Sequence, residues 1–281
     1  MQNCFYLEGP TAEIWKASEP SFSFVKDAFV KLTTRLYPHG TEHEVVPILR
    51  SLIPDHKFEE KSGNWCVVVP GDDATMFTAH LDTALEIHGK DTCSVKHVFN
   101  GDVVKTDETT ILGADDKAGV VLMVYMIRNR VPGHYYFFSG EEAFCVGSEQ
   151  LAKDASNLKE YRRCISLDAP GYSRVTTRQL NPRLHMRFEC CSVEFARALA
   201  DRLNWIDPLF AFSAYPDGLC TDSRCFTQFI SECTNLSVGY FYLHTRKEEQ
   251  NLAFLSRLAD ALIKMEWSSL PYVRQPVEDE W

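Results

Sequence analysis

Hydrophobic and polar positions along the chain fall into blocks that predict helices and strands. Longer blocks with apolar residues at helical spacing predict helices at 23–37, 42–52, 116–130, 148–155, 193–203 and 249–267. Short apolar runs predict strands at 65–69, 76–81, 134–139, 163–167 and 236–243. Because strands and helices alternate, we expect an α/β fold, a three-layer αβα sandwich around a central mixed β-sheet.

Some details of this pattern bear on packing and domain organisation. A Pro-Gly-Asp-Asp segment at 70–73 separates the first two strands, so we expect them to form a hairpin-like pair. The helix at 116–130 is apolar on most of its faces, which predicts that it is packed deep in the molecule. Residues 1–270 are expected to form a single domain, and 271–281 a polar, loose tail.

The composition is that of an ordinary globular protein, with 45% hydrophobic and 24% charged residues among 281. The formal net charge of −10 argues against a nucleic-acid partner, because no basic excess exists to displace counterions from phosphates, and it disfavours a membrane surface. The N-terminus lacks the pattern of a secretory signal, and no stretch is long enough to span a bilayer. Ten cysteines without a Cys-x-x-Cys pair indicate reduced thiols and a cytoplasmic protein.

Five short polar motifs lie around the ends of the predicted strands, where open α/β sheets bind their ligands. In the first, His80 and Asp82 are two positions apart, so their side chains point to the same face of a strand. The Asp82 carboxylate could then accept the imidazole N–H and direct the other ring nitrogen to a metal. A chance pair at a strand end is the alternative interpretation.

The second motif, Leu-Gly-Ala-Asp-Asp-Lys-Ala-Gly at 112–119, stands just before the apolar helix. Asp is a favoured helix N-cap, but a cap does not explain two aspartates together with the glycines on either side. Asp115 could bridge two cations with its two carboxylate oxygens.

The third motif, Gly-Glu-Glu at 140–142, follows a predicted buried strand directly. Adjacent carboxylates project in different directions, so one could bind a metal while the other faces an attacking water. Two surface glutamates are the alternative. The fourth and fifth motifs are apolar strands that end in Asp168 and in His244; each residue alone would suit a turn or a hydrogen-bonded core position.

Taken in order, His-x-Asp, Gly-x-Asp-Asp, Glu-Glu, Asp and His resemble the metallopeptidase clan of dizinc aminopeptidases, carboxypeptidases and deacylases. The resemblance covers roughly residues 25–265. The run at 113–119 resembles the M20 tripeptidase branch, whereas the compact layout is similar to the single-domain, M28-like aminopeptidases. Too few residues separate Asp168 from His244 for the lid domain that the tripeptidase branch inserts there.

The resemblance implies a role for each motif. Asp115 would bridge two divalent ions, expected to be Zn²⁺ with Co²⁺ or Mn²⁺ as alternatives. The remaining metal ligands would be His80 and Asp168 on one ion and Glu142 and His244 on the other. Glu141 would transfer the proton of the attacking water to the leaving amine, and Asp82 would orient His80. The resemblance also implies a cis peptide bond between Asp115 and Asp116.

Substrate recognition is less defined by the sequence. Asp222 and Ser223 resemble the pocket signature of the clan, although a turn followed by a helix N-cap would give the same letters. The carboxylate of a substrate could form an ion pair with an arginine such as Arg246. The alternative for each candidate arginine is a solvent-exposed position on the surface. The candidate arginines are Arg178, Arg183, Arg224 and Arg246.

The resemblance implies a metallopeptidase, most simply an aminopeptidase-like exopeptidase acting on small peptides. An N-acyl amino acid deacylase or carboxypeptidase is the alternative within the clan. Two further alternatives share the scaffold: a catalytically inactive binding module, and a single-zinc aminoacyl cyclase. The chain has all five candidate metal ligands and Glu141, which disfavours both the inactive module and the cyclase. Without a lid domain the usual dimer surface is missing, so we expect a monomer.

Overall fold

The computed structural model describes residues 14–17, 19, 21–84, 94–154, 158–181 and 185–276. Its centre is an eight-stranded sheet with the strand order β1-β2-β6-β3-β7-β13-β8-β11. In chain order these strands are β1 (Glu59–Lys61), β2 (Asn64–Val69), β3 (Thr75–His80), β6 (Gly133–Phe138), β7 (Arg163–Ala169), β8 (Arg174–Thr176), β11 (Ser213–Tyr215) and β13 (Glu232–Ser237).

The strand directions make this sheet mixed, as predicted. β3 runs parallel to β6 and β7, and β13 runs parallel to β7. β2 is antiparallel to β6, and β8 is antiparallel to β13. The predicted hairpin of β2 with β3 is wrong, because β6 lies between the two strands and pairs with both. Every residue of β3 is buried, which is typical of a central strand covered on both faces.

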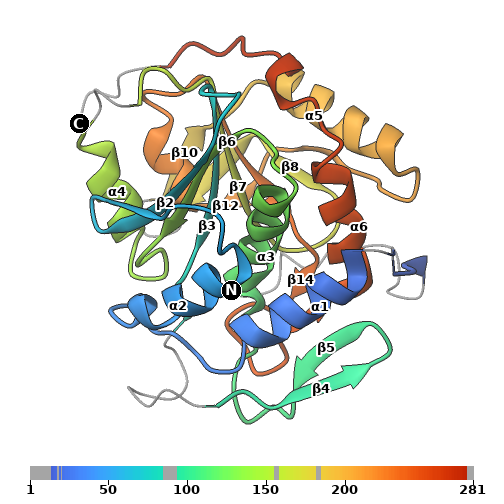
Figure 1. The fold of residues 1–281 in the computed structure, drawn as a ribbon. Coiled ribbons are helices and arrows are strands. Elements are labelled where there is room, and N and C mark those ends of the chain that lie inside the picture. The colour runs from blue at the N-terminus through green and yellow to red at the C-terminus, as the bar shows by residue number, and fades with distance from the viewer. Residues whose placement is uncertain are drawn as a thin grey trace.

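Helices cover both faces of the sheet (Figure 1). On one face α1 (Ser21–Leu32), α3 (Ala114–Arg128) and α6 (Leu252–Leu262) pack against one another, with α3 lying over β3 and β7. α4 (Val146–Ala152) and the 3-10 helix η4 (Asp222–Phe226) pack together on the other face. α5 (Val193–Ile206) packs against β8 and β11. The predicted three-layer αβα sandwich is confirmed.

Alternating residues of the central strands fill the two spaces between the layers. In β3, Phe77 belongs to the apolar cluster beneath α1, α3 and α6, whereas Met76 belongs to the cluster beneath α4 and η4. In β6, Phe137 and Phe138 divide in the same way. Because successive side chains of a strand point to opposite faces, each strand contributes to both cores.

Several predicted elements differ at their ends. α1 ends at Leu32, short of the predicted end at 37. The predicted helix 42–52 is a 3-10 turn, η2 (Glu42–Glu44), followed by α2 (Val46–Leu52). Pro47 lies in the first turn of α2, where a missing N–H costs no helical hydrogen bond, so a new helix begins there.

The C-terminal third departs further from the prediction. The predicted strand 236–243 is divided, because Gly239 has a φ of +93° and separates β13 from β14 (Tyr240–Phe241). A Cβ at Gly239 would lie 2.5 Å from Cδ1 of Phe254, so the position needs glycine for space as well. The predicted helix 249–267 begins with a strand, β15 (Glu249–Asn251), and α6 starts only after Asn251, whose side chain accepts the Phe254 N–H as an N-cap.

Two smaller sheets were not predicted, because their strands are too short for a clear apolar pattern. One joins β10 (Met186–Glu189), β9 (Arg178–Asn181) and β12 (Gly218–Leu219). The other joins β14, β15, β5 (Val103–Thr106) and β4 (His97–Asn100), and its β4–β5 hairpin extends below α1 in Figure 1. A last 3-10 turn, η5 (Trp267–Ser269), follows α6.

No helix among the described residues is long and apolar enough to cross a membrane. The described cysteines are free thiols. At the start of the predicted tail, the Arg274 guanidinium donates to the carbonyl oxygens of Thr227, Ile230 and Ser231. Residues 277–281 of that tail, and the last residue of the predicted helix 148–155, lie outside the described residues.

Gly119 allows α3 to lie directly against β7. A Cβ at this position would lie 2.1 Å from the Leu167 carbonyl oxygen and 2.6 Å from Oδ1 of Asp116. We therefore expect Gly119→Ala to lower the free energy of unfolding by about 3 kcal/mol, the upper part of the usual range for overpacking. Urea unfolding measures this loss.

The matched control for this substitution is Gly101→Ala, in the β4–β5 turn. Gly101 has a positive φ, +58°, but a Cβ added there would have no atom within 4 Å. The control should cost only about 1 kcal/mol, the strain of a left-handed residue. Equal losses in the two variants would contradict the close approach of α3 to β7.

Candidate metal centre

The carboxyl ends of three neighbouring strands bring the first group of polar side chains together. His80 is the last residue of β3 and pairs in register with Phe138, the last residue of β6. Glu141 and Glu142 follow β6 after a short turn, and Asp168 lies near the end of β7. Because parallel strands end at the same edge of the sheet, these residues lie close together.

Asp115 reaches the same edge from the start of α3. Gly113 has a left-handed backbone, and the backbone angles of Asp115 and Asp116 are not helical, so regular helix begins after them. The Asp115–Asp116 peptide bond is cis, as expected from the resemblance. His244 is delivered by the turn after β14 rather than by the end of a long strand.

The two oxygens of Asp115 face two different histidines. Oδ1 of Asp115 lies 3.0 Å from Nε2 of His80, and Oδ2 lies 3.1 Å from Nε2 of His244. Nε2 of His80 is also 3.7 Å from Oδ1 of Asp168, and Nε2 of His244 is 2.8 Å from Oε1 of Glu142. These distances define two groups of candidate ligands, His80–Asp115–Asp168 and Asp115–Glu142–His244, which share Asp115.

Buried charges in this cluster strongly affect one another. Burial disfavours the charged imidazole of His80, but the carboxylates of Asp115 and Asp168 outweigh it and raise the pKa of His80 well above its usual range. Burial and the neighbouring Asp115 carboxylate raise the pKa values of Asp168 and Glu142. A divalent cation between these carboxylates would relieve their repulsion.

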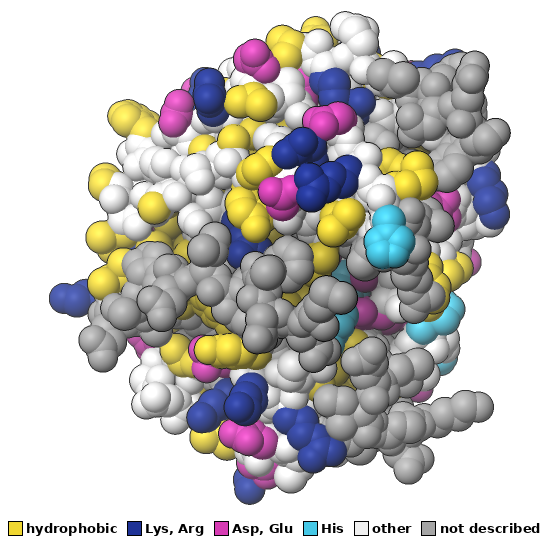
Figure 2. All heavy atoms as spheres, turned by 180° about the vertical axis from the view of Figure 1, so that it is seen from behind, with side chains coloured by type: hydrophobic (Ala, Val, Ile, Leu, Met, Phe, Trp, Pro, Cys, Tyr) yellow, Lys and Arg dark blue, Asp and Glu magenta, His cyan; other side chains and the backbone are white. Residues whose placement is uncertain are grey.

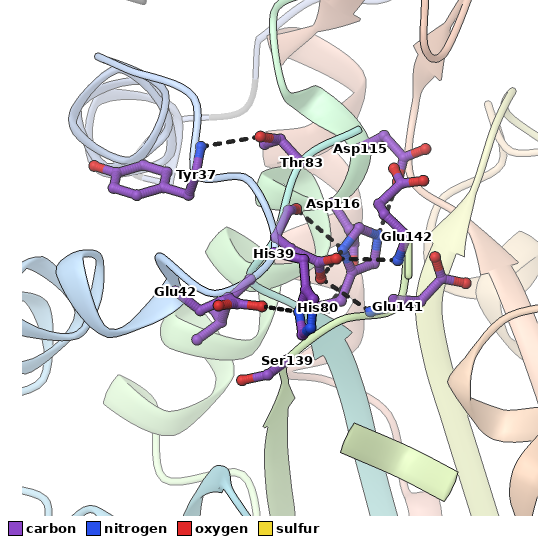
Figure 3. Close-up of polar contacts among 12 residues, drawn as sticks. Tyr37, His39, Glu42, His80, Thr83, Asp115, Asp116, Ser139, Glu141 and Glu142 are labelled. Atoms are coloured by element: carbon purple, nitrogen blue, oxygen red, sulfur yellow. Dashed lines mark hydrogen bonds and ion pairs between the residues drawn. The ribbon is translucent and has the colours of Figure 1, made fainter. Parts of the chain in front are cut away.

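Asp82 links the histidine to the two glutamates. One of its oxygens accepts the backbone N–H of Glu141 and the other that of Glu142, both at 3.0 Å. Nδ1 of His80 lies 3.3 Å from Oδ1 of Asp82 and 3.2 Å from its backbone oxygen, so Nε2 is the ring nitrogen turned toward Asp115. Figure 3 shows His80, at the end of β3, beside Glu141 and Glu142 in the turn after β6.

Glu141 lies beside the candidate ligands. Carboxylate oxygens of Glu141 and Glu142 and a ring nitrogen of His80 all lie within 4.8 Å of one another. Burial raises the pKa of Glu141 well above its usual range, and the nearby Asp168 carboxylate acts in the same direction. A carboxylate with a raised pKa can both accept and return a proton near neutral pH.

The candidate substrate residues are placed differently from one another. Asp222 and Ser223 are fully buried in η4. Oδ1 of Asp222 accepts the Ser148 hydroxyl, and burial raises its pKa to about 7. The Ser223 hydroxyl donates to the Thr234 carbonyl oxygen and accepts from the Gln179 amide.

The four candidate arginines do not converge on the centre. Arg246 is exposed two residues after His244. Arg178 donates to the Pro216 carbonyl oxygen, and Arg224 pairs with Glu149. Arg183 lies outside the described residues. The described part of the chain therefore offers no arginine paired with a candidate ligand.

Several residues that hold the candidate ligands were not identified from the sequence. Asp116 accepts the backbone N–H groups of His80 and Gly119. Asp168 accepts the hydroxyls of Thr221 and Tyr240. Glu248 accepts three backbone N–H groups around Asp115. The buried position of Glu248 in the polar run after His244 carries no periodic signal that could have identified it.

The donor set fits divalent cations. Nε2 of His244 and Oε1 of Glu142 are 2.8 Å apart, yet Oε1 is buried without a hydrogen-bond partner among the described residues. A nitrogen and an oxygen this close together, with Oε1 lacking a hydrogen-bond partner in the described part of the chain, could hold a common ion. Mixed imidazole and carboxylate donors suit zinc and its neighbours among the transition metals. On the face shown in Figure 2, histidine and acidic side chains gather to the right of the centre.

Fold and donor set together define an α/β protein with a candidate two-metal centre at the carboxyl edge of its parallel strands. Residues 64–249 match the sequence pattern of peptidase family M28. The chain belongs to this family. An uncharacterized protein of Bacillus subtilis (strain 168), YqjE, is 41% identical over 86 residues, which are 28% of this chain and 22% of the relative. The chain thus spans about a fifth of the curated relative that it matches.

Solved structures share the fold at low sequence identity. Aminopeptidase PepT from Bacillus cereus ATCC 10987 superposes with a TM-score of 0.71 at 17% identity, over 86% of this chain and 97% of that chain. A tripeptidase from Staphylococcus aureus subsp. aureus Mu50 superposes with a TM-score of 0.71 at 16% identity, over 86% and 97% of the two chains.

Proposed function

We propose that this protein is a metal-dependent exopeptidase, of the aminopeptidase type, that acts on small peptides. The observation that carries the proposal is the position of Asp115, whose two oxygens lie 3.0 and 3.1 Å from the Nε2 atoms of His80 and His244. One carboxylate between two imidazoles is the arrangement that a bridging ligand of two cations requires. Membership of peptidase family M28 supports the same activity.

The metal ions are proposed to be two Zn²⁺ ions, with Co²⁺ or Mn²⁺ as substitutes. His80 and Asp168 would bind one ion, Glu142 and His244 the other, and Asp115 both. When bound, the ions would polarise the scissile carbonyl group and make water a better nucleophile. Two divalent cations would also offset the negative charge of the three ligand carboxylates, which are otherwise costly to bury together.

Glu141 is proposed as the residue that moves the proton. Its backbone N–H is held by Asp82, and its carboxylate lies within 4.8 Å of ligand atoms of His80 and Glu142. From there it would accept a proton from the attacking water and return it to the leaving amine. Asp82 would touch neither substrate nor metal, and it positions both His80 and the Glu141–Glu142 turn.

The substrate class is proposed from charge. With two cations offsetting the three ligand carboxylates, the negative charge left to act on a substrate would come from Glu141, when ionised, and from the formal charge of −10 of the whole chain. A free α-ammonium group is attracted to such a site, whereas an acylated amine carries no charge. This favours peptides with a free N-terminus over N-acyl amino acids.

A substrate panel tests this preference. We expect the zinc-loaded protein to hydrolyse free-amine dipeptides and tripeptides with a kcat/KM at least tenfold above that for the same peptides N-acetylated, a difference of about 1.4 kcal/mol. N-acetyl amino acids form the third arm of the panel. A preference for these would instead identify a deacylase, and hydrolysis from the C-terminus a carboxypeptidase. A monomeric, cytoplasmic enzyme remains our expectation.

A further inference from the structure

Glu248 is a buried carboxylate that the proposed chemistry does not use. It lies at the end of the turn after β14, just before β15, and is 1% exposed. Its Oε2 accepts the backbone N–H groups of Leu112 and Gly113, each at 2.8 Å, and its Oε1 accepts that of Asp115 at 3.0 Å. Both carboxylate oxygens are therefore directed at the loop that presents Asp115.

This contact joins the two loops that carry ligands of the same proposed metal. His244 lies four residues before Glu248 in the turn after β14, and Asp115 lies at the end of the loop that Glu248 holds. Nε2 of His244 is 3.1 Å from Oδ2 of Asp115. A second link ties the same loops, because the Thr106 hydroxyl shares its one proton between the backbone oxygens of Thr110, at 2.8 Å, and Arg246, at 3.4 Å.

The local backbone explains why the loop needs such a partner. Gly113 is left-handed, and Asp115 and Asp116 have non-helical angles. The N–H groups at the start of α3 thus lack the partners that a helix or strand would supply, and a buried N–H must find another acceptor. The Glu248 carboxylate accepts the N–H groups of Leu112, Gly113 and Asp115, and so holds the backbone that carries the Asp115 side chain.

We propose that Glu248 is a positioning residue that sets metal affinity by holding the Asp115 loop against the His244 turn. The proposal rests on the proposed function, since it assumes that Asp115 and His244 bind a metal. Residues that orient metal ligands through hydrogen bonds typically contribute 10–100-fold to metal affinity or activity. Glu248 acts on backbone groups and touches no reacting atom.

Glu248→Gln is the most informative substitution. The side chain keeps its shape, but one oxygen becomes an amide NH₂, which would face backbone N–H donors instead of accepting from them. The expected result is a 10–100-fold weaker affinity for Zn²⁺. The affinity is measured on the zinc-loaded protein by competition with a chromogenic zinc chelator, a readout that does not depend on catalysis.

Glu232→Gln is the matched control. Glu232 is also fully buried and also accepts three backbone N–H groups, those of Ser192, Val273 and Arg274, at 2.7–3.0 Å. It lies at the start of β13, and none of the candidate ligands belongs to that strand. Both substitutions disturb a buried carboxylate of the same kind, so both should lower the thermal midpoint, but only Glu248→Gln should weaken zinc binding.

The outcomes separate this inference from the function on which it rests. The role of Glu248 is overturned if Glu248→Gln binds zinc within twofold of the native affinity, or if its affinity falls no further than that of Glu232→Gln. Either result leaves the proposed metallopeptidase activity of the native protein standing. A native protein that binds no divalent cation overturns both. If Glu248→Gln does not fold, zinc affinity is measured in Glu248→Asp instead. The shorter side chain keeps the charge but reaches fewer N–H groups, so native zinc affinity in that variant also overturns the proposal.

Discussion

Glu141→Gln should retain two metal ions per chain and lose about 10²–10⁴-fold in kcat, the usual contribution of a general acid–base group. The amide has nearly the same shape as the carboxylate but cannot accept the proton of water. The backbone N–H of Glu141 would still donate to Asp82, so the turn that carries Glu142 should stay in place. Metal content by elemental analysis and turnover of a free-amine tripeptide measure the two effects separately.

Glu160→Gln is the control for this substitution. Glu160 is an exposed glutamate near the start of β7, and its change to the amide removes the same charge from the protein surface. It should leave both kcat and metal content unchanged. If Glu141→Gln kept most of the native turnover, or lost its metal together with its activity, Glu141 would not be the proton-transfer group.

Asp115→Ala should lose the metals themselves. The substitution removes the one carboxylate whose two oxygens face both His80 and His244, at 3.0 and 3.1 Å. We expect metal content to fall from two ions toward none per chain and activity to fall at least as far as in Glu141→Gln. Excess zinc should restore little activity, because neither ion keeps its shared ligand.

Asp55→Ala is the matched control for this loss. Asp55 is exposed in the turn after α2, so it should keep two metals and full activity. Far-ultraviolet circular dichroism of both variants checks that the fold persists. If Asp115→Ala and Glu141→Gln had equal activity and each kept two metals, the proposed roles of Asp115 as a metal ligand and Glu141 as the proton carrier would be wrong.

The central layers of the fold could be predicted because their sequence signals are strong. β3, β6 and β7 each have a short apolar segment at their centre, and α3 is apolar on most faces, so these elements could be located from the sequence pattern. The pairing of β2 with β3 could not be predicted in this way. A local turn suggests a hairpin, but strand order depends on which distant strand, here β6, supplies the better partner.

The candidate ligands could be named from sequence because each follows or precedes a recognisable element. The structure brings His80 and His244 each within hydrogen-bond distance of Asp115, although the role of the three residues as ligands stays a prediction. The predicted strand leading to His244 was too long, since Gly239 divides it. Glu248 could not be found, because its importance lies in backbone N–H groups that are distant in sequence.

Substrate recognition was the least predictable part. Asp222 and Ser223 carry a motif, but the structure buries both and engages their side chains with Ser148, Gln179 and Thr234. Any part they have in binding substrate would be indirect in this conformation. Specificity depends on the shape of a surface assembled from several loops, which neither periodicity nor spacing encodes.

The central claim is that two cations share Asp115, and anomalous diffraction at the zinc edge from crystals of the zinc-loaded protein tests it most directly. We predict two strong peaks, one between His80, Asp115 and Asp168 and the other between Asp115, Glu142 and His244. Zinc peaks located away from Asp115, or none at all at saturating zinc, would contradict it.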